Sequence, residues 1–158
     1  MSVLLVVHVV ISLVGIAAGF VVVRGLWTGH RTDGLTAVFL VTTIATSVTG
    51  FPLPADRVLP SHVVGVLTLV ALGVAIEARY RRRLAGGWRR AYVIASLLAL
   101  YFNVFVGVVQ AFLNVPALHA LAPTQAEWPF LLTQVALVAA FVALGRGVLA
   151  RFHPRAAA

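Results

Sequence analysis

The chain of 158 residues is long enough for one compact domain and too short for two ordinary ones. Its residues are 61% hydrophobic and 10% charged, with a mean hydropathy of +1.04, whereas soluble domains carry about 25% charged residues. A soluble domain of this size leaves about a third of its chain surface in water. The composition therefore excludes a soluble protein and predicts a single transmembrane helical domain over residues 1–158.

Residue types that are missing exclude further classes of function. The chain has no Cys, which excludes disulfides and thiolate metal sites. All 12 basic residues are Arg, which excludes a lysine Schiff base and the lysine of a phosphate-binding loop. The formal charge of +8 does not indicate nucleic-acid binding, because the arginines flank apolar segments, where they act as topology signals.

Five apolar segments are long enough to span a bilayer as helices, which predicts an all-α polytopic transmembrane bundle. In chain order they run over about residues 3–27, 35–52, 61–80, 91–113 and 128–149. Pro52 and Pro54 close the second segment, whose apolar core is short, so a four-span alternative keeps it re-entrant. The connection that holds Pro116 and Pro123 is too polar and too broken to span.

The arginines predict the orientation. If the cluster over residues 79–90 lies in the cytoplasm, five spans place 11 of the 12 arginines on that side and leave Arg57 outside. The N-terminus is then outside and the C-terminus cytoplasmic. The first span lacks the basic region and the cleavage site of a signal peptide, so we expect it to be retained. Glu77 precedes Arg81 by four residues, which predicts a solvated ion pair at the membrane surface.

Polar and small side chains recur at helical spacing on the first three spans. One face of the first span carries His8, Ser12, Gly15 and Gly19. Its Gly15–Gly19 pair is a GxxxG motif that permits close helix packing, whereas an imidazole in hydrocarbon must find polar partners. On the third span, His62 shares a face with Gly65, Leu69 and Gly73. This face predicts a close-packed seam, with His62 directed at the seam or capping at the interface.

Hydroxyl side chains gather on the second span, at Thr42, Thr43, Thr46, Ser47 and Thr49. Such hydroxyls usually bond back to backbone carbonyls of their own helix or to a neighbouring helix, so we interpret them mainly as structural. The fourth span carries a polar stripe at spacings of four and three, formed by Tyr92, Ser96, Ala99, Asn103, Gly107, Gln110 and Asn114. Interhelical hydrogen bonding and a lined cavity both explain this stripe.

Depth and helical phase together predict a polar ligand pocket in the outer leaflet. Its candidate lining residues are Asn103, Gln110, Asn114, Gln134, Thr46 and Thr49. His8 and His62 lie at similar depth, and the loop that holds His119, Gln125 and Glu127 would cover the site. Neutral amides and imidazole suit a neutral or weakly acidic ligand, such as a quinone or a lipid headgroup. Apart from Glu77 at the membrane surface, the spans hold no carboxylate for a proton or sodium relay, which disfavours an ion-driven transporter.

Two stretches carry a resemblance. The run from Asn103 to Gln125, with Gln110, Asn114, Pro116, His119 and Pro123, resembles one in a family of small, uncharacterised bacterial multi-pass inner-membrane proteins. More distantly, His8, Gly15, Gly29-His30-Arg31, Gly34, His62 and Gly87-Trp88-Arg89-Arg90 look like positions in predicted four-helix membrane families, some of which are suspected to bind b-type haem. The resemblance implies a small bacterial inner-membrane protein without an assigned activity.

Three functions follow as hypotheses. The first is an accessory or assembly subunit of a bacterial membrane complex, which self-associates or packs against other subunits through its polar and small helix faces. The second is a module that binds or conducts a small ligand, a quinone or a lipid through the outer-leaflet pocket. The third is a redox module in which His8 and His62 are the axial ligands of one b-type haem. The spans show no nucleophile–base–acid set and no carboxylate pair, so a hydrolytic enzyme is not favoured.

Overall fold

The computed structural model describes residues 3–30, 32–52 and 60–152, and over these residues the secondary structure is entirely helical. The elements are α1 (Val3–Trp27), α2 (Asp33–Gly50), α3 (Pro60–Ile76), the π-helix η1 (Glu77–Arg81), α4 (Trp88–Asn114), α5 (Pro116–Leu121) and α6 (Trp128–Arg151). Arg31, Pro54, Arg57 and Arg155, which enter the sequence predictions, lie outside the described residues.

Five of these helices are long and apolar enough to cross a membrane, which confirms the five-segment prediction for the fold. They are α1, α2, the continuous segment Ser61–Arg81, α4 and α6. Two elements were not predicted. α5 forms in the proline-containing connection, where Pro116 occupies the first turn and the preceding Val115 is extended. η1 widens the last turn of the third span.

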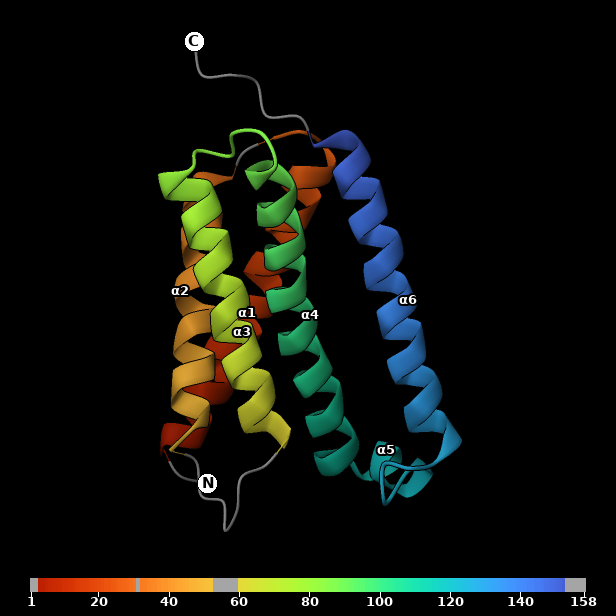
Figure 1. Ribbon diagram of the computed structural model, residues 1–158. Coiled ribbons are helices and arrows are strands. Elements are labelled where there is room, and N and C mark those ends of the chain that lie inside the picture. Colours follow the sequence, from red (N-terminus) through yellow and green to blue (C-terminus); the bar gives the residue numbers. More distant parts are fainter. Residues whose placement is uncertain (1–2, 31, 53–59, 153–158) are drawn as a thin grey trace.

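Helices α1 to α4 pack side by side as an antiparallel bundle, and α6 lies beside α4 at its edge (Figure 1). One end of the molecule holds the α1–α2 turn, the η1–α4 connection and the last turn of α6, and we call it the arginine end. Three arginines join its segments: Arg79 bonds Asp33, Arg89 donates to the Phe152 carbonyl, and Arg151 lies over the Trp27 ring at 4.2 Å. α5 lies at the opposite end (Figure 1).

The tight turns at the arginine end depend on left-handed residues. Gly29 has φ 74°, and the His30 N–H donates to the Gly25 carbonyl at 2.8 Å, so α1 ends in a Schellman-type turn. In the η1–α4 connection, Gly86 has φ 53°, and the non-glycine residues Arg83 and Leu84 have φ 49° and 60°. These backbone conformations reverse the chain within a few residues and bring α4 directly alongside α3.

Gly15 and Gly19 let α1 approach α2 and α4 closely, as their spacing predicts. A Cβ atom on Gly19 would lie 2.6 Å from Leu100 and 3.0 Å from Phe39. The main core surrounds this contact and extends toward the arginine end; its largest fully buried apolar side chains are Tyr92, Phe39, Phe152, Leu72, Leu100 and Val22. The four-helix part is therefore held by close packing, the force that associates helices where no water drives burial.

α6 contacts the bundle near its middle and near both ends. Near the middle, Phe141 lies with its ring centroid 5.5 Å from that of Tyr101 of α4 and 6.4 Å from that of Phe20 of α1. Near the opposite end, Phe130 packs edge-on against Phe112 of α4, with ring centroids 5.3 Å apart. At the arginine end, Val148 is fully buried and Gly147 lies against Trp27. Phe130 and Val148 are the only buried residues in the helix.

Two side-chain expectations are tested by the structure. Glu77 pairs with Arg81 at 3.4 Å, as predicted, and also with Arg82 at 3.0 Å. The seam predicted on the third span packs at Gly65, where a Cβ would lie 3.5 Å from the Phe51 ring. The prediction is wrong at Gly73, which is exposed and where a Cβ would meet no atom within 4 Å.

Candidate functional site

A polar cluster lies around Gly15, where α1, α2 and α4 meet. A Cβ atom on Gly15 would lie 3.0 Å from Thr42 Oγ1, 3.3 Å from Thr43 Oγ1 and 3.4 Å from the Asn103 amide nitrogen. We call Gly15, Thr42, Thr43 and Asn103 the Gly15 cluster. Thr43 is fully buried and Asn103 is 8% exposed. The absence of a side chain at Gly15 leaves the space into which the three polar groups converge.

Two members of the Gly15 cluster have unused hydrogen-bonding capacity. Thr42 donates to the Val38 carbonyl at 2.7 Å and is satisfied. Thr43 Oγ1 and Asn103 Nδ2 are buried and have no hydrogen-bond partner. Buried polar groups in native proteins nearly always find a partner, and each exception calls for an explanation. Inside a membrane bundle, such groups indicate a functional site by default.

Hydroxyls on α2 divide into two sets. Thr42, Ser47 and Thr49 bond back to carbonyls one turn earlier, which confirms the structural interpretation for them. Thr43 and Thr46 form no such bond, so this interpretation is wrong for both. The difference follows from side-chain rotamer, which residue type and spacing do not determine.

His8 pairs with Thr49 across the α1–α2 contact. His8 Nδ1 lies 2.9 Å from Thr49 Oγ1, and the same hydroxyl donates its single hydrogen to the Ala45 carbonyl at 2.7 Å. Thr49 must therefore accept from His8, which assigns the Nδ1-protonated tautomer to the neutral ring. Nε2 then carries the lone pair. This is the arrangement in which a second group orients a histidine for ligation through its other nitrogen.

His62 lies near the start of α3, where its ring stacks on Phe51 with centroids 5.8 Å apart and an interplanar angle of 11°. Phe51 also contacts Gly65, because a Cβ there would lie 3.5 Å from the Phe51 ring. Each of the two histidines thus packs against the end of α2, His8 through a hydroxyl and His62 through an aromatic ring. The pairing of His8 with His62 as haem ligands stays a prediction.

The remaining predicted pocket residues fall into different environments. Gln110 and Asn114 are exposed at the end of α4, where Asn114 Nδ2 donates to Gln110 Oε1 at 3.1 Å. On α6, the amide nitrogen and oxygen of Gln134 are both buried without a hydrogen-bond partner. On α2, the Thr46 hydroxyl is also buried without a partner. The polar stripe of α4 is therefore buried at Tyr92, Ser96 and Asn103 and exposed at Gln110.

The loop before α6 is held by a carboxylate turn. Gln125 donates to the Val109 carbonyl at 3.0 Å and so joins the loop to α4. Glu127 accepts from the Thr124 hydroxyl at 2.8 Å and from the backbone N–H groups of Thr124 and Ala126. Desolvation opposes ionisation of Glu127, but these hydrogen bonds outweigh it and lower the pKa of the carboxyl below its ordinary value.

A buried arginine at the arginine end was missed by the sequence analysis. The Arg79 side chain is 7% exposed, pairs with Asp33, and donates to the Tyr92 hydroxyl at 3.2 Å. Its guanidinium also lies 5.4 Å from the centre of the Tyr92 ring. Arg79 lies seven residues after Leu72 and four after Ala75, both buried, so it continues the inward face of the third span into η1. The helical spacing was available in the sequence, but the charge of Arg79 placed it with the arginine-rich loop.

Comparisons of the chain with protein-family models, with curated proteins and with solved structures find no match. Among the residues that the structure describes, no three or more His, Cys, Asp or Glu side chains gather to hold a metal ion. Three features of the chain's own geometry are therefore candidates for a function: the exposed face of α6, the Gly15 cluster and the His8–Thr49 pair.

Proposed function

We propose that the protein is an accessory or assembly subunit of a bacterial inner-membrane complex, and that α6 is the helix that contacts the other subunits. The observation that carries the proposal is the exposure of α6. Apart from Phe130 and Val148, every residue of this helix is partly or fully exposed. A helix that is exposed along most of its length within its own chain has surface left to pack against another protein.

The exposed face of α6 has the composition of a membrane helix–helix interface. Exposed alanines recur at spacings of three and four residues, at Ala136, Ala139, Ala140 and Ala143. Small residues at this spacing let a second helix approach closely enough for backbone-to-backbone packing. Lipid contact alone would not require small side chains on this face. The partner that fits is an apolar transmembrane helix, from another subunit or from a second copy.

The orientation in the membrane is also a proposal. The arginine end carries nine described arginines, at positions 24, 79, 81, 82, 83, 89, 90, 146 and 151. Loops rich in arginine are retained in the cytoplasm. The arginine end is thus the cytoplasmic end, which places the N-terminus outside and the C-terminus inside.

The test is to enlarge the alanine face and measure the size of the native complex. Ala139→Leu and Ala143→Leu are separately introduced in the source organism, and the complex is resolved by native gel electrophoresis after mild solubilisation. We expect both variants to lose the high-mass complex while the chain itself remains in the membrane. Ala37→Leu, the same change at an exposed alanine of α2, is the matched control and should retain the complex. An intact complex in both α6 variants would refute the proposal.

A second candidate function is binding of a small neutral polar ligand at the Gly15 cluster. The specific observation that favours it is the pair of partnerless buried groups, Thr43 Oγ1 and Asn103 Nδ2. A ligand with a carbonyl or hydroxyl group, such as a quinone, would satisfy the Asn103 donor. Asn103→Leu keeps a similar volume and removes the amide. If a ligand fills the site, extracts of the purified wild-type protein contain it and those of the variant lack it; equal extracts would exclude this function.

A further inference from the structure

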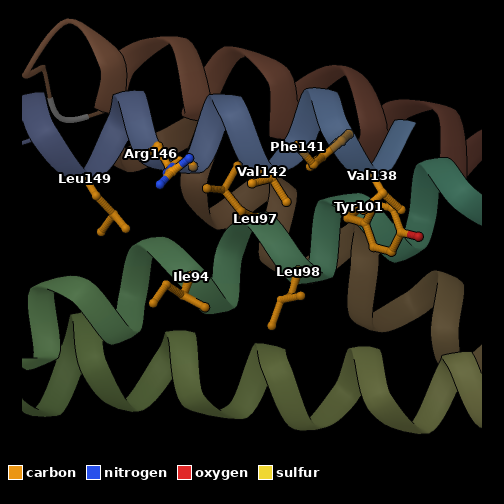
Figure 2. Close-up of a pocket in the computed structure, with 10 residues that line it drawn as sticks. Ile94, Leu97, Leu98, Tyr101, Val138, Phe141, Val142, Arg146 and Leu149 are labelled. Atoms are coloured by element: carbon orange, nitrogen blue, oxygen red, sulfur yellow. The ribbon is translucent and has the colours of Figure 1, made fainter. Parts of the chain in front are cut away.

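An apolar groove runs between α4 and α6 (Figure 2). Its volume is about 380 Å³, and its walls are formed mainly by Ile94, Leu97 and Leu98 of α4 and Val138, Val142 and Leu149 of α6. Gly145 helps to keep it open, because a Cβ at that position would already lie 3.3 Å from Leu97. Tyr101 of α4 and Phe141 of α6 also belong to the lining, where their ring centroids are 5.5 Å apart.

The length of the groove matches one bilayer leaflet. Along α6 its lining extends from Val138 to Leu149, and along α4 from Ile94 to Tyr101. At 1.5 Å per residue these stretches are roughly 16 and 10 Å long. Half of a bilayer's hydrocarbon core measures about 15 Å. A single acyl chain that enters from the leaflet at the arginine end fits this groove, whereas a whole transmembrane helix, about 10 Å wide, would not enter it.

Two arginines, Arg146 and Arg90, place positive charge at one end of the groove. Arg146 belongs to its lining, near the arginine end, while Tyr101 lies toward the far end (Figure 2). Arg90 lies one turn before Ile94, on the same face of α4, and is exposed. Arg146 lies five residues before the end of α6, about 7 Å inside it. At that depth an arginine reaches the headgroup layer by extending its side chain.

None of the acidic residues that the structure describes is paired with Arg146 or Arg90. Of the acidic residues that the structure describes, Asp33 pairs with Arg79, Glu77 pairs with Arg81 and Arg82, and Glu127 bonds the loop at the opposite end. An arginine at the edge of the hydrocarbon layer is costly unless an anion meets it. Guanidinium groups bind phosphate oxygens through paired, charge-assisted hydrogen bonds. The groove therefore combines an acyl-chain channel with a phosphate-binding entrance.

We propose that the α4–α6 groove is a binding site for an anionic phospholipid of the leaflet at the arginine end. One acyl chain lies along Ile94, Leu98 and Val142, and the phosphate contacts Arg146 and Arg90. The selectivity for an anionic lipid comes from the two positive charges without an acid beside them, because a zwitterionic headgroup would bring its own cation to the arginines. This site is separate from the alanine face of α6 and does not depend on the subunit proposal.

The test measures lipid retention by native mass spectrometry. The full chain is purified in mild detergent and given equal amounts of phosphatidylglycerol and phosphatidylcholine with the same acyl chains. We expect phosphatidylglycerol to be retained preferentially, and Arg146→Gln to weaken its binding roughly three- to tenfold, the range expected for loss of a partly exposed charge-assisted contact. Arg83→Gln removes the same charge from an exposed loop position outside the groove and should leave binding unchanged.

A second pair of variants tests the groove itself. Val142 is 55% exposed within the groove lining, and Val70 is 61% exposed on α3. Because both side chains point outward, tryptophan at either position leaves the core intact. Val142→Trp should exclude the bound lipid, and Val70→Trp should not. Equal retention of the two lipids, an equal loss in Arg83→Gln, or unchanged binding in Val142→Trp would each overturn the proposal.

Discussion

Replacing Gly147 by alanine is expected to loosen α6 from the bundle. A Cβ at Gly147 would lie closer than 3.0 Å to two atoms of the Trp27 ring, Cζ3 and Cη2. Carbon atoms prefer a separation of about 3.5–4.0 Å. The ring cannot yield without cost, because the Arg151 guanidinium covers it at 4.2 Å and its other neighbours belong to the core. Overpacking of this kind costs about 1–3 kcal/mol.

The magnitude has to be separated from helix propensity, since alanine is favoured over glycine in a helix by up to about 1 kcal/mol. Gly73→Ala supplies the control, because a Cβ there meets nothing within 4 Å while the gain in propensity is shared. The difference in melting temperature between Gly147→Ala and Gly73→Ala therefore measures the cost of overpacking alone. At about 2–4 °C per kcal/mol for a chain of this length, Gly147→Ala should melt roughly 2 to 12 °C below Gly73→Ala.

The assay is thermal unfolding in detergent, followed by circular dichroism for both variants and for each combined with Trp27→Leu. In the Trp27→Leu background the penalty at Gly147 should largely disappear, because the ring that the Cβ meets is gone. Equal melting temperatures for Gly147→Ala and Gly73→Ala would refute the reasoning. A penalty that persists without the Trp27 ring would assign the cost to some other contact and would equally contradict it.

Three further outcomes are expected. Arg79→Met should cost about 1–3 kcal/mol in thermal unfolding, because it leaves the buried Tyr92 hydroxyl without its partner; Asp33→Asn should cost less than about 1 kcal/mol, since that carboxylate is 76% exposed, and equal costs would contradict this division. The haem hypothesis predicts Soret and alpha bands in protein from haem-supplied cells, lost in both His8→Ala and His62→Ala; a colourless, folded protein excludes it. Hydrogen bonds lower the pKa of Glu127, so its contribution to the loop is present above the ordinary carboxyl pKa and is lost as the pH falls through the depressed value. A carboxyl titration followed by NMR should therefore have its midpoint below the ordinary value, and a midpoint at or above it would contradict the assigned hydrogen bonds.

The number of helices long and apolar enough to span was predictable because hydropathy over about 20 residues reports directly on the bilayer. The Gly15–Gly19 contact was predictable because two glycines one turn apart are typical of close helix packing. Gly73 was not predicted correctly. It lies on the face of Gly65, which packs against Phe51, but Gly73 itself is exposed. In a membrane protein the outside is as apolar as the inside, so periodicity finds a face without indicating how much of it packs.

Polar side chains were harder to place for a related reason. Helical spacing placed Asn103 and Gln110 on one polar stripe of α4, but in the structure Asn103 is buried and Gln110 is exposed. Neighbours cover α4 unequally along its length, and a single sequence does not give the tilt between helices. Arg79 shares the buried face of α3 with Leu72 and Ala75, but its charge led us to place it in the loop that follows. A charged residue next to an arginine-rich loop looks like part of that loop until the backbone is seen.

Polar groups along the bundle differ in whether they have partners, and this difference bears on function. At the arginine end, Arg79, Arg89 and Asp33 join separate segments through bonds that cross the bundle. Ser96 Oγ, about two turns into α4, and the polar groups of Thr46 and Gln134 have no partner. Partnerless groups in a low-dielectric interior are costly, and the cost falls when a ligand or another chain supplies the partner. A ligand or a second chain would therefore stabilise the protein at these three residues and not at those that are already bonded.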